Sequence, residues 1–244
     1  MDGLSSNIAL FSVVMAGGFI VYFLEDKVTK YFKYILAFSG AFLLAISVLH
    51  VIPEVYQAQT ANIGLFVLLG FLIQLVLEYF SQGIEHGHFH VNANNPKLFL
   101  VPILVSLCLH AFLEGLPLVN EISNEHHVGH SHSNSLLFGI LLHKFPISIA
   151  LMTLFLKAKL KMNYAFFGLL IFAIMAPLGN FIGVTFQDSF TSHLPIFDYI
   201  LAIVLGMFLH ISTTILFESD ESHKFNLMKL IVIIAGGGIA YLVV

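Results

Sequence analysis

The amino-acid sequence predicts an all-α integral membrane protein with eight transmembrane helices. Of the 244 residues, 58% are hydrophobic and only 10% are charged, whereas about a quarter of the residues in a soluble domain are charged. The mean hydropathy is +0.93. The apolar residues form stretches of roughly 20, the length that a helix needs to cross the hydrocarbon of a bilayer. We therefore expect a single transmembrane domain that extends over residues 1–244.

The expected helices are separated by short polar segments, the first of which is Glu25-Asp26-Lys27. Proline, asparagine, glutamine and charged residues mark the later breaks, and the last helix is the shortest. The expected ranges are 5–24, 34–56, 62–81, 98–119, 135–157, 163–186, 195–218 and 227–243.

The lysines predict the orientation in the membrane. All ten basic residues are lysines, and nine of them lie in or beside the connections that follow the first, third, fifth and seventh expected helices. The connections after the second, fourth and sixth helices carry none. Because positive residues are enriched in cytoplasmic connections, we expect both termini to face away from the cytoplasm. The nine lysines are Lys27, Lys30, Lys33, Lys97, Lys157, Lys159, Lys161, Lys224 and Lys229.

Three ionisable residues lie inside two of the expected helices. His110 and Glu114 are four residues apart, which places them on one helix face, and His143 lies in the next helix. A charged carboxylate at the centre of a bilayer costs about 2.5–3.5 kcal/mol even on insertion scales, so it is expected to have a partner or a cargo. Antiparallel helices four and five would bring the three side chains to a similar depth. Two imidazoles and a carboxylate are a ligand set that suits zinc.

Prolines accompany this group. Pro117 and Pro146 fall within the expected fourth and fifth helices. A proline removes a backbone donor and clashes with the carbonyl four residues earlier. The sequence therefore predicts free carbonyls at Leu113 and Leu142, beside the proposed site.

Other polar residues in the helices leave alternatives open. His110 and Glu114 could be only a buried His–Glu pair. Lys144 could neutralise Glu114 as its counter-ion, or its side chain could extend to the membrane surface. His210 could bind metal or could hydrogen-bond to another helix. His50 and Glu54, at the outer end of the second helix, could collect the ion or could be an ordinary interfacial helix end.

Histidine clusters flank the membrane on both sides. Histidine-rich tracts commonly bind metals, so the two clusters strengthen the metal hypothesis. The cluster on the expected cytoplasmic side is Glu85, His86, His88 and His90. The cluster on the expected outer side is His126, His127, His130 and His132.

These motifs resemble the ZIP (Zrt/Irt-like) family of divalent metal transporters, over nearly the whole chain. His-Ala-Phe-Leu-Glu-Gly at 110–115 is similar to the family pattern His-Ser-x-x-Glu-Gly, and His-Lys-Phe-Pro at 143–146 resembles His-Lys-x-Pro-Glu. Residues 38–54, 176–183 and 206–210 look like further family segments. The resemblance implies a 3+2+3 bundle and zinc uptake toward the cytoplasm by alternating access, with Fe²⁺, Mn²⁺ or Cd²⁺ as other substrates. It also implies that His110, Glu114 and His143 are metal ligands.

The chain departs from the family pattern at the centre. Ile147 stands where the pattern has a metal-binding Glu, and Ala111 replaces a polar residue. Together with Lys144, these residues remove the groups for a second, bridged metal, so we expect a single-metal centre.

Two other functions stay open: a degenerate relative that binds or senses metal, and an intramembrane zinc hydrolase with Glu114 as general base. The absence of a His-Glu-x-x-His motif speaks against the hydrolase. We expect no enzymatic activity, a location in the cell membrane, and a divalent metal ion and the lipid bilayer as partners. Nucleic acid is not expected, and a homodimer stays open.

Overall fold

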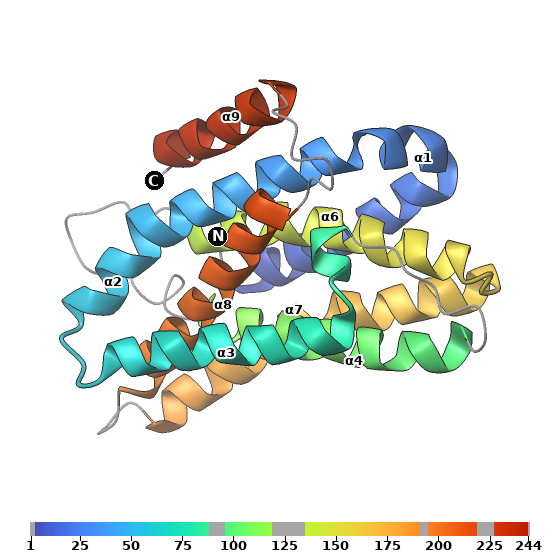
Figure 1. The fold of residues 1–244 in the computed structure, drawn as a ribbon. Coiled ribbons are helices and arrows are strands. Elements are labelled where there is room, and N and C mark those ends of the chain that lie inside the picture. The colour runs from blue at the N-terminus through green and yellow to red at the C-terminus, as the bar shows by residue number, and fades with distance from the viewer. Residues whose placement is uncertain (1–2, 88–95, 119–134, 191–194, 219–226, 244) are drawn as a thin grey trace.

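A computed structural model describes residues 3–87, 96–118, 135–190, 195–218 and 227–243. The described chain consists of helices and short connections. Both ends of the chain lie toward the side of the bundle where α2 connects to α3 (Figure 1). The elements are α1 (Gly3–Ile46), the π-helix η1 (Ser47–Val51), α2 (Ile52–Gln57), α3 (Ile63–Ser81), the 3₁₀-helix η2 (Ile84–His86), α4 (Pro96–Gly115), α6 (Ser135–Lys157), α7 (Met162–Phe190), α8 (Ile196–Glu218) and α9 (Leu227–Val243).

Helix α1 comprises the first two expected helices. Leu24 has φ −136° and ψ 31°, values outside the helical region, and the chain reverses there. The second half then continues through η1 and α2, so that Lys27–Gln57 forms one apolar segment. The reversal coincides with the charged residues that the sequence placed between the two helices, because charged side chains favour the aqueous interface over the hydrocarbon.

Hydropathy and length make this chain a multi-pass membrane protein. Within the described ranges, six helical segments are long and apolar enough to cross a membrane, and Phe99–Gly115 and Leu227–Val243 are shorter apolar helices. Each of the eight expected ranges overlaps one of these segments. The six long segments are Gly3–Glu25, Lys27–Gln57, Ile63–Ser81, Ser135–Lys157, Met162–Phe186 and Ile196–Phe217.

The fourth helix ends earlier than the sequence predicted. Helix α4 ends at Gly115, so Pro117 lies beyond the helix and does not interrupt it. The expected free carbonyl of Leu113 is also wrong, because this oxygen accepts a hydrogen bond from the backbone N–H of Leu116 at 3.2 Å. A proline disfavours the helical conformation of the residue before it, which explains why the helix stops here. Pro146, in contrast, lies inside α6 as expected.

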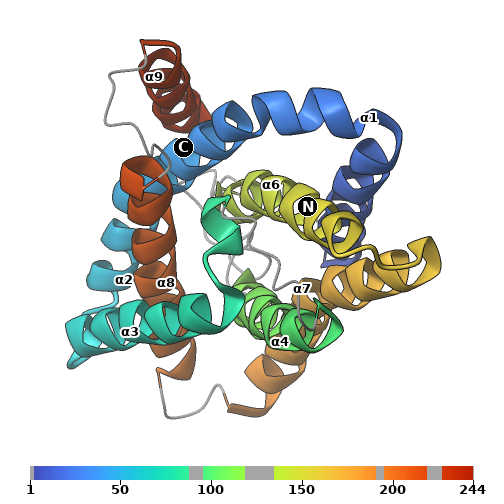
Figure 2. The same ribbon diagram turned by 45° about the vertical axis from the view of Figure 1, so that its right-hand side comes forward.

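Helix α6 lies inside the bundle, and most of its residues are buried. It packs mainly on α1, whereas α4 packs mainly on α7 and α3 packs on α8. Figure 2 shows α6 surrounded by the other helices and α9 at the outer edge beside α1. The expected fourth and fifth helices, α4 and α6, are thus not each other's main packing partners, although both contribute to the site described below.

Glycines allow the closest of these helix contacts. A Cβ atom added at Gly179 of α7 would lie 2.1 Å from the carbonyl oxygen of Phe112 in α4. A Cβ atom at Gly206 of α8 would lie 2.0 Å from the carbonyl oxygen of Val67 in α3. Small residues permit such backbone approach in membranes. These contacts fix α3 and α4, which carry most of the polar residues of the site.

Candidate metal centre

His110, Glu114 and His143 come together inside the bundle. The first two project from one face of α4, one turn apart, and the third projects from α6. One ligand atom from each residue lies within 4.8 Å of the other two, and in the part of the chain that the structure describes this is the one group with such metal-ligand geometry. All three side chains are completely buried. The structure thus assembles the three residues that the sequence singled out.

Gln74 determines which nitrogen of His110 carries the proton. Its side-chain amide donates from Nε2 to Glu85 Oε2 at 2.6 Å, because a carboxylate only accepts. The amide oxygen of Gln74 therefore faces His110 Nδ1, at 3.0 Å. This oxygen is an acceptor, so Nδ1 must be the donor. In the neutral imidazole the other nitrogen, Nε2, is then an unprotonated acceptor.

This Nε2 atom faces the carboxylate of Glu114. His110 Nε2 and Glu114 Oε1 lie 2.9 Å apart, and neither atom has a hydrogen-bond partner besides the other. Two acceptors at this separation repel each other unless a proton or a metal ion lies between them. In a tetrahedral zinc site with bonds of 2.0–2.1 Å, ligand atoms are about 3.3 Å apart. The pair is therefore close to the spacing that a zinc ion requires.

His143 completes the group. Its ring lies 5.9 Å from that of His110, centroid to centroid, at an interplanar angle of 81°. Both ring nitrogens of His143 are buried without a hydrogen-bond partner. Leaving a buried polar group unsatisfied costs about 1–3 kcal/mol. Coordination to a metal ion would compensate this cost for one of the two nitrogens.

Lys144 neutralises the second oxygen of Glu114. Its Nζ atom donates to Glu114 Oε2 at 2.6 Å and lies 5.3 Å from the centroid of the Phe172 ring. The lysine is buried, with 1% of its surface exposed, so the side chain does not reach the membrane surface. Of the alternatives that the sequence left open for Lys144, the structure shows the ion pair with Glu114.

A comparison with protein-family models shows to which family this chain belongs. The model of the ZIP zinc transporters matches residues 98–243, more than half of the chain. The chain belongs to the ZIP family. This confirms the resemblance drawn from the sequence, although the match begins at α4 and does not include residues 38–54. A search of curated proteins found no match.

Membership of the ZIP family supports transport of divalent metal ions as the function. The matched region contains α4 and α6, and therefore all three residues of the metal centre. The family consists of transporters, which favours transport over the intramembrane hydrolase.

The outer pair of this ZIP protein lies apart from the centre. His50 Nε2 and Glu54 Oε2 are 3.8 Å apart, and their side chains are 17% and 37% exposed. His50 lies in the π-helix η1, a type of irregularity that often occurs at functional sites. At the same end of the bundle, Thr60 donates a hydrogen bond to Asp198 at 2.6 Å.

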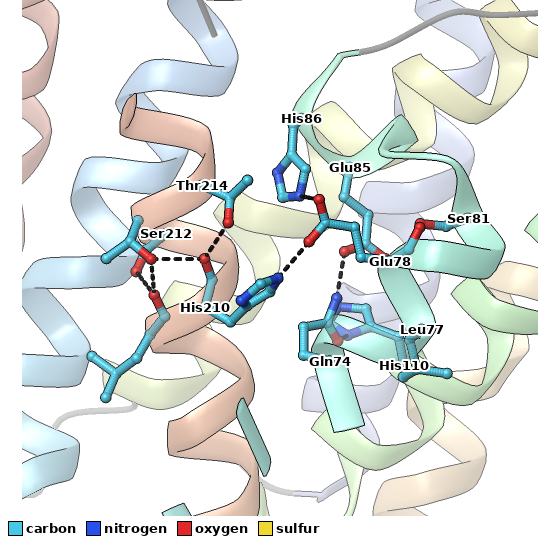
Figure 3. A network of polar contacts seen from close by, with 12 residues as sticks. Gln74, Leu77, Glu78, Ser81, Glu85, His86, His110, His210, Ser212 and Thr214 are labelled. Atoms are coloured by element: carbon cyan, nitrogen blue, oxygen red, sulfur yellow. Dashed lines mark hydrogen bonds and ion pairs between the residues drawn. The ribbon is translucent and has the colours of Figure 1, made fainter. Parts of the chain in front are cut away.

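The cluster on the expected cytoplasmic side is described in part. Glu85 and His86 belong to η2, where both are buried. His210, on α8, contacts Glu78 (Figure 3). The interhelical contact that the sequence offered as an alternative for His210 is therefore present. His88, His90 and the four outer histidines lie outside the described residues.

Sequence reasoning missed Gln74 and Glu78. These residues are four apart in the otherwise apolar α3, and so share one helix face. The same spacing identified His110 and Glu114, so the signal was present in the sequence. Each of the two overlooked residues contacts a histidine that the sequence had singled out.

Proposed function

We propose that this protein carries divalent metal ions, zinc above all, across the cell membrane into the cytoplasm, with His110, Glu114 and His143 as the intramembrane binding site. The observation that carries the proposal is the position of His110 Nε2, which faces the Glu114 carboxylate at 2.9 Å while Gln74 holds Nδ1. The two unpartnered nitrogens of His143 support it further. Imidazole and carboxylate ligands suit zinc well but also accommodate Fe²⁺, Mn²⁺ and Cd²⁺.

Burial of the centre supports alternating access. None of the three ligand side chains is exposed, so an ion enters or leaves only when the helices around the centre move. His50 and Glu54 would collect the ion at the outer face. Glu85 and His86, with His88 and His90, would receive it inside. The lysine distribution supports this orientation of the helices.

The centre is proposed to hold a single metal ion. Glu114 presents one oxygen to His110 and the other to Lys144, so no oxygen of this carboxylate is left for a second metal. Ile147 and Ala111, both buried, supply no ligand. With neutral imidazoles, the charges of Glu114 and Lys144 cancel. Lys144 thus weakens the attraction of Glu114 for a dication, which favours the moderate affinity that release requires.

The same ion pair favours a second candidate function. If Lys144 competes too strongly for Glu114, the protein would bind or sense metal without efficient transport. Uptake and binding must therefore be measured on the same preparation.

The test is zinc uptake into proteoliposomes that contain a zinc-sensitive dye. We expect saturable uptake by the unmodified protein and none by the His110→Ala/Glu114→Ala double variant. Glu25→Gln, at an exposed carboxylate of α1, is the matched control and should transport normally. Zinc binding without uptake by the unmodified protein would favour the binding or sensing function. Efflux from zinc-loaded vesicles only, with the orientation of the protein determined, would reverse the proposed direction.

A further inference from the structure

A second group of metal-binding side chains surrounds Glu78, near the end of α3. His86 Nε2 lies 3.0 Å from Glu78 Oε1, and His210 Nε2 contacts the other oxygen, Oε2. The three residues come from η2, α3 and α8 (Figure 3). A carboxylate that offers one oxygen to each of two imidazoles can bind a metal through either or both oxygens. The donor types are thus the same as at the metal centre, but the three ligand atoms do not all lie within 4.8 Å of one another, so the two imidazoles would have to move closer together around a shared ion.

His86 resembles His110 in its surroundings. Its side chain is completely buried, its Nε2 atom faces only the Glu78 carboxylate, and its Nδ1 atom has no partner. Its separation from Glu78 again approaches the spacing of about 3.3 Å between ligand atoms of a tetrahedral zinc ion. A buried imidazole that merely tied η2 to the bundle would be expected to complete its hydrogen bonds.

A continuous line of polar side chains connects the two groups. Gln74 lies one turn before Glu78 in α3 and contacts both His110 and Glu85. Glu85 precedes His86 directly. An ion leaving the centre by this route passes oxygen and nitrogen ligands in place of lipid. Such a path greatly lowers the cost of moving a charge through the bilayer.

The second group is the first point of this route that reaches the surface. The residues of the centre, Glu85 and the His86 side chain are buried, whereas the Glu78 side chain is 19% exposed. Glu78 also lines a surface depression of about 750 Å³, together with Tyr79, Gln82 and Gly83. This depression lies at the end of α3 that the lysines assign to the cytoplasm. The second group therefore lies between the buried centre and the surface.

We propose that Glu78, His86 and His210 form a second divalent-cation site, at which the ion stops between the metal centre and the cytoplasm. This inference rests on the proposed function, since the site receives the ion that the centre releases. The alternative is a purely structural group that joins η2, α3 and α8. The two differ in whether these side chains bind zinc.

The test compares the zinc bound per chain by purified protein. Glu78→Gln removes the charge, but its amide can still hydrogen-bond to both imidazoles, so a structural role would survive. We expect each of the variants Glu78→Gln and His143→Ala to lower the affinity for one of two zinc ions at least about tenfold, as even indirect ligand changes do. The affected ion should differ between the two variants, and the double variant should bind both ions weakly. Zinc bound by other histidines contributes equally to the variants and to the unmodified protein, so it does not affect the comparison. Glu25→Gln is the matched carboxylate control.

A second variant distinguishes the loss of a zinc ligand from misfolding. His210→Gln can still donate a hydrogen bond to Glu78 and should lose the same equivalent as Glu78→Gln, with zinc uptake lowered at least about tenfold. If His143→Ala loses an equivalent while Glu78→Gln and His210→Gln lose none, the second site is overturned and the proposed function stands. If His143→Ala itself loses none, the metal centre, and with it the proposed function, is overturned.

Discussion

At the scale of single residues, Lys144 most distinguishes this centre from a simple pair of histidines and a carboxylate. Its ammonium group lies against Glu114 Oε2, deep in the bundle. It stabilises the carboxylate when no ion is bound, and it repels a dication that binds at the other oxygen. The same contact therefore favours the metal-free state and limits the affinity for metal.

Replacement of Lys144 should change stability and affinity in opposite directions. We expect Lys144→Met to lower the free energy of unfolding of the zinc-free protein by roughly 3–5 kcal/mol, the usual cost of leaving a buried charge unpaired. Zinc should bind at least about tenfold more tightly and restore most of the loss, since the ion replaces the missing positive charge. Thermal unfolding with and without zinc, together with calorimetry, measures both effects.

Lys30→Met, at an exposed lysine of α1, controls for the loss of a positive charge. Normal zinc-free stability and unchanged zinc affinity in Lys144→Met would show that the ion pair does not govern the centre.

The sequence allowed prediction of the three central residues but not of their surroundings. His110 and Glu114 stand out because ionisable residues are rare in apolar helices, and their spacing reveals the shared face. Gln74 fixes the tautomer of His110 from another helix. That contact depends on how α3 and α4 pack, which spacing within one helix cannot reveal.

At the scale of helices, the packing of α3 on α8 places Glu78 beside His210 and holds Gln74, the partner of His110, in position. Gly206 permits this contact, and both Glu78 and His210 lie on these two helices. The existence of the helices follows from hydropathy, since each long one contains about 20 apolar residues. Which helices pack together does not follow from hydropathy, because lipid-facing and helix-facing apolar side chains look alike in a sequence.

A methyl group at Gly206 should force α3 and α8 apart. We expect Gly206→Ala to destabilise the protein by about 1–3 kcal/mol, as overpacking usually does, and to reduce zinc uptake. Gly237→Ala is the matched control, because an added Cβ there meets nothing within 4 Å. Thermal unfolding and uptake measure the two effects. Equal behaviour of the two variants would mean that the close contact is dispensable.

At the scale of the whole molecule, the structure shows a centre closed off by its own helices. The proposed ligands come from α4 and α6, whose main contacts are with α7 and α1 respectively. Relative movement of these helices would therefore open the site without breaking the largest interfaces of either one. The orientation of the bundle in the membrane stays a prediction from the lysines, whereas its closed state depends on side-chain packing and was not predictable from the sequence.

The most direct test of the metal centre is a crystal structure of the zinc-loaded protein, with anomalous diffraction at the zinc edge. We expect one zinc ion in the centre, bound by His110 Nε2, Glu114 Oε1 and one ring nitrogen of His143, with Lys144 still beside Oε2. A centre that contains no zinc, or two zinc ions bridged by Glu114, would contradict this expectation.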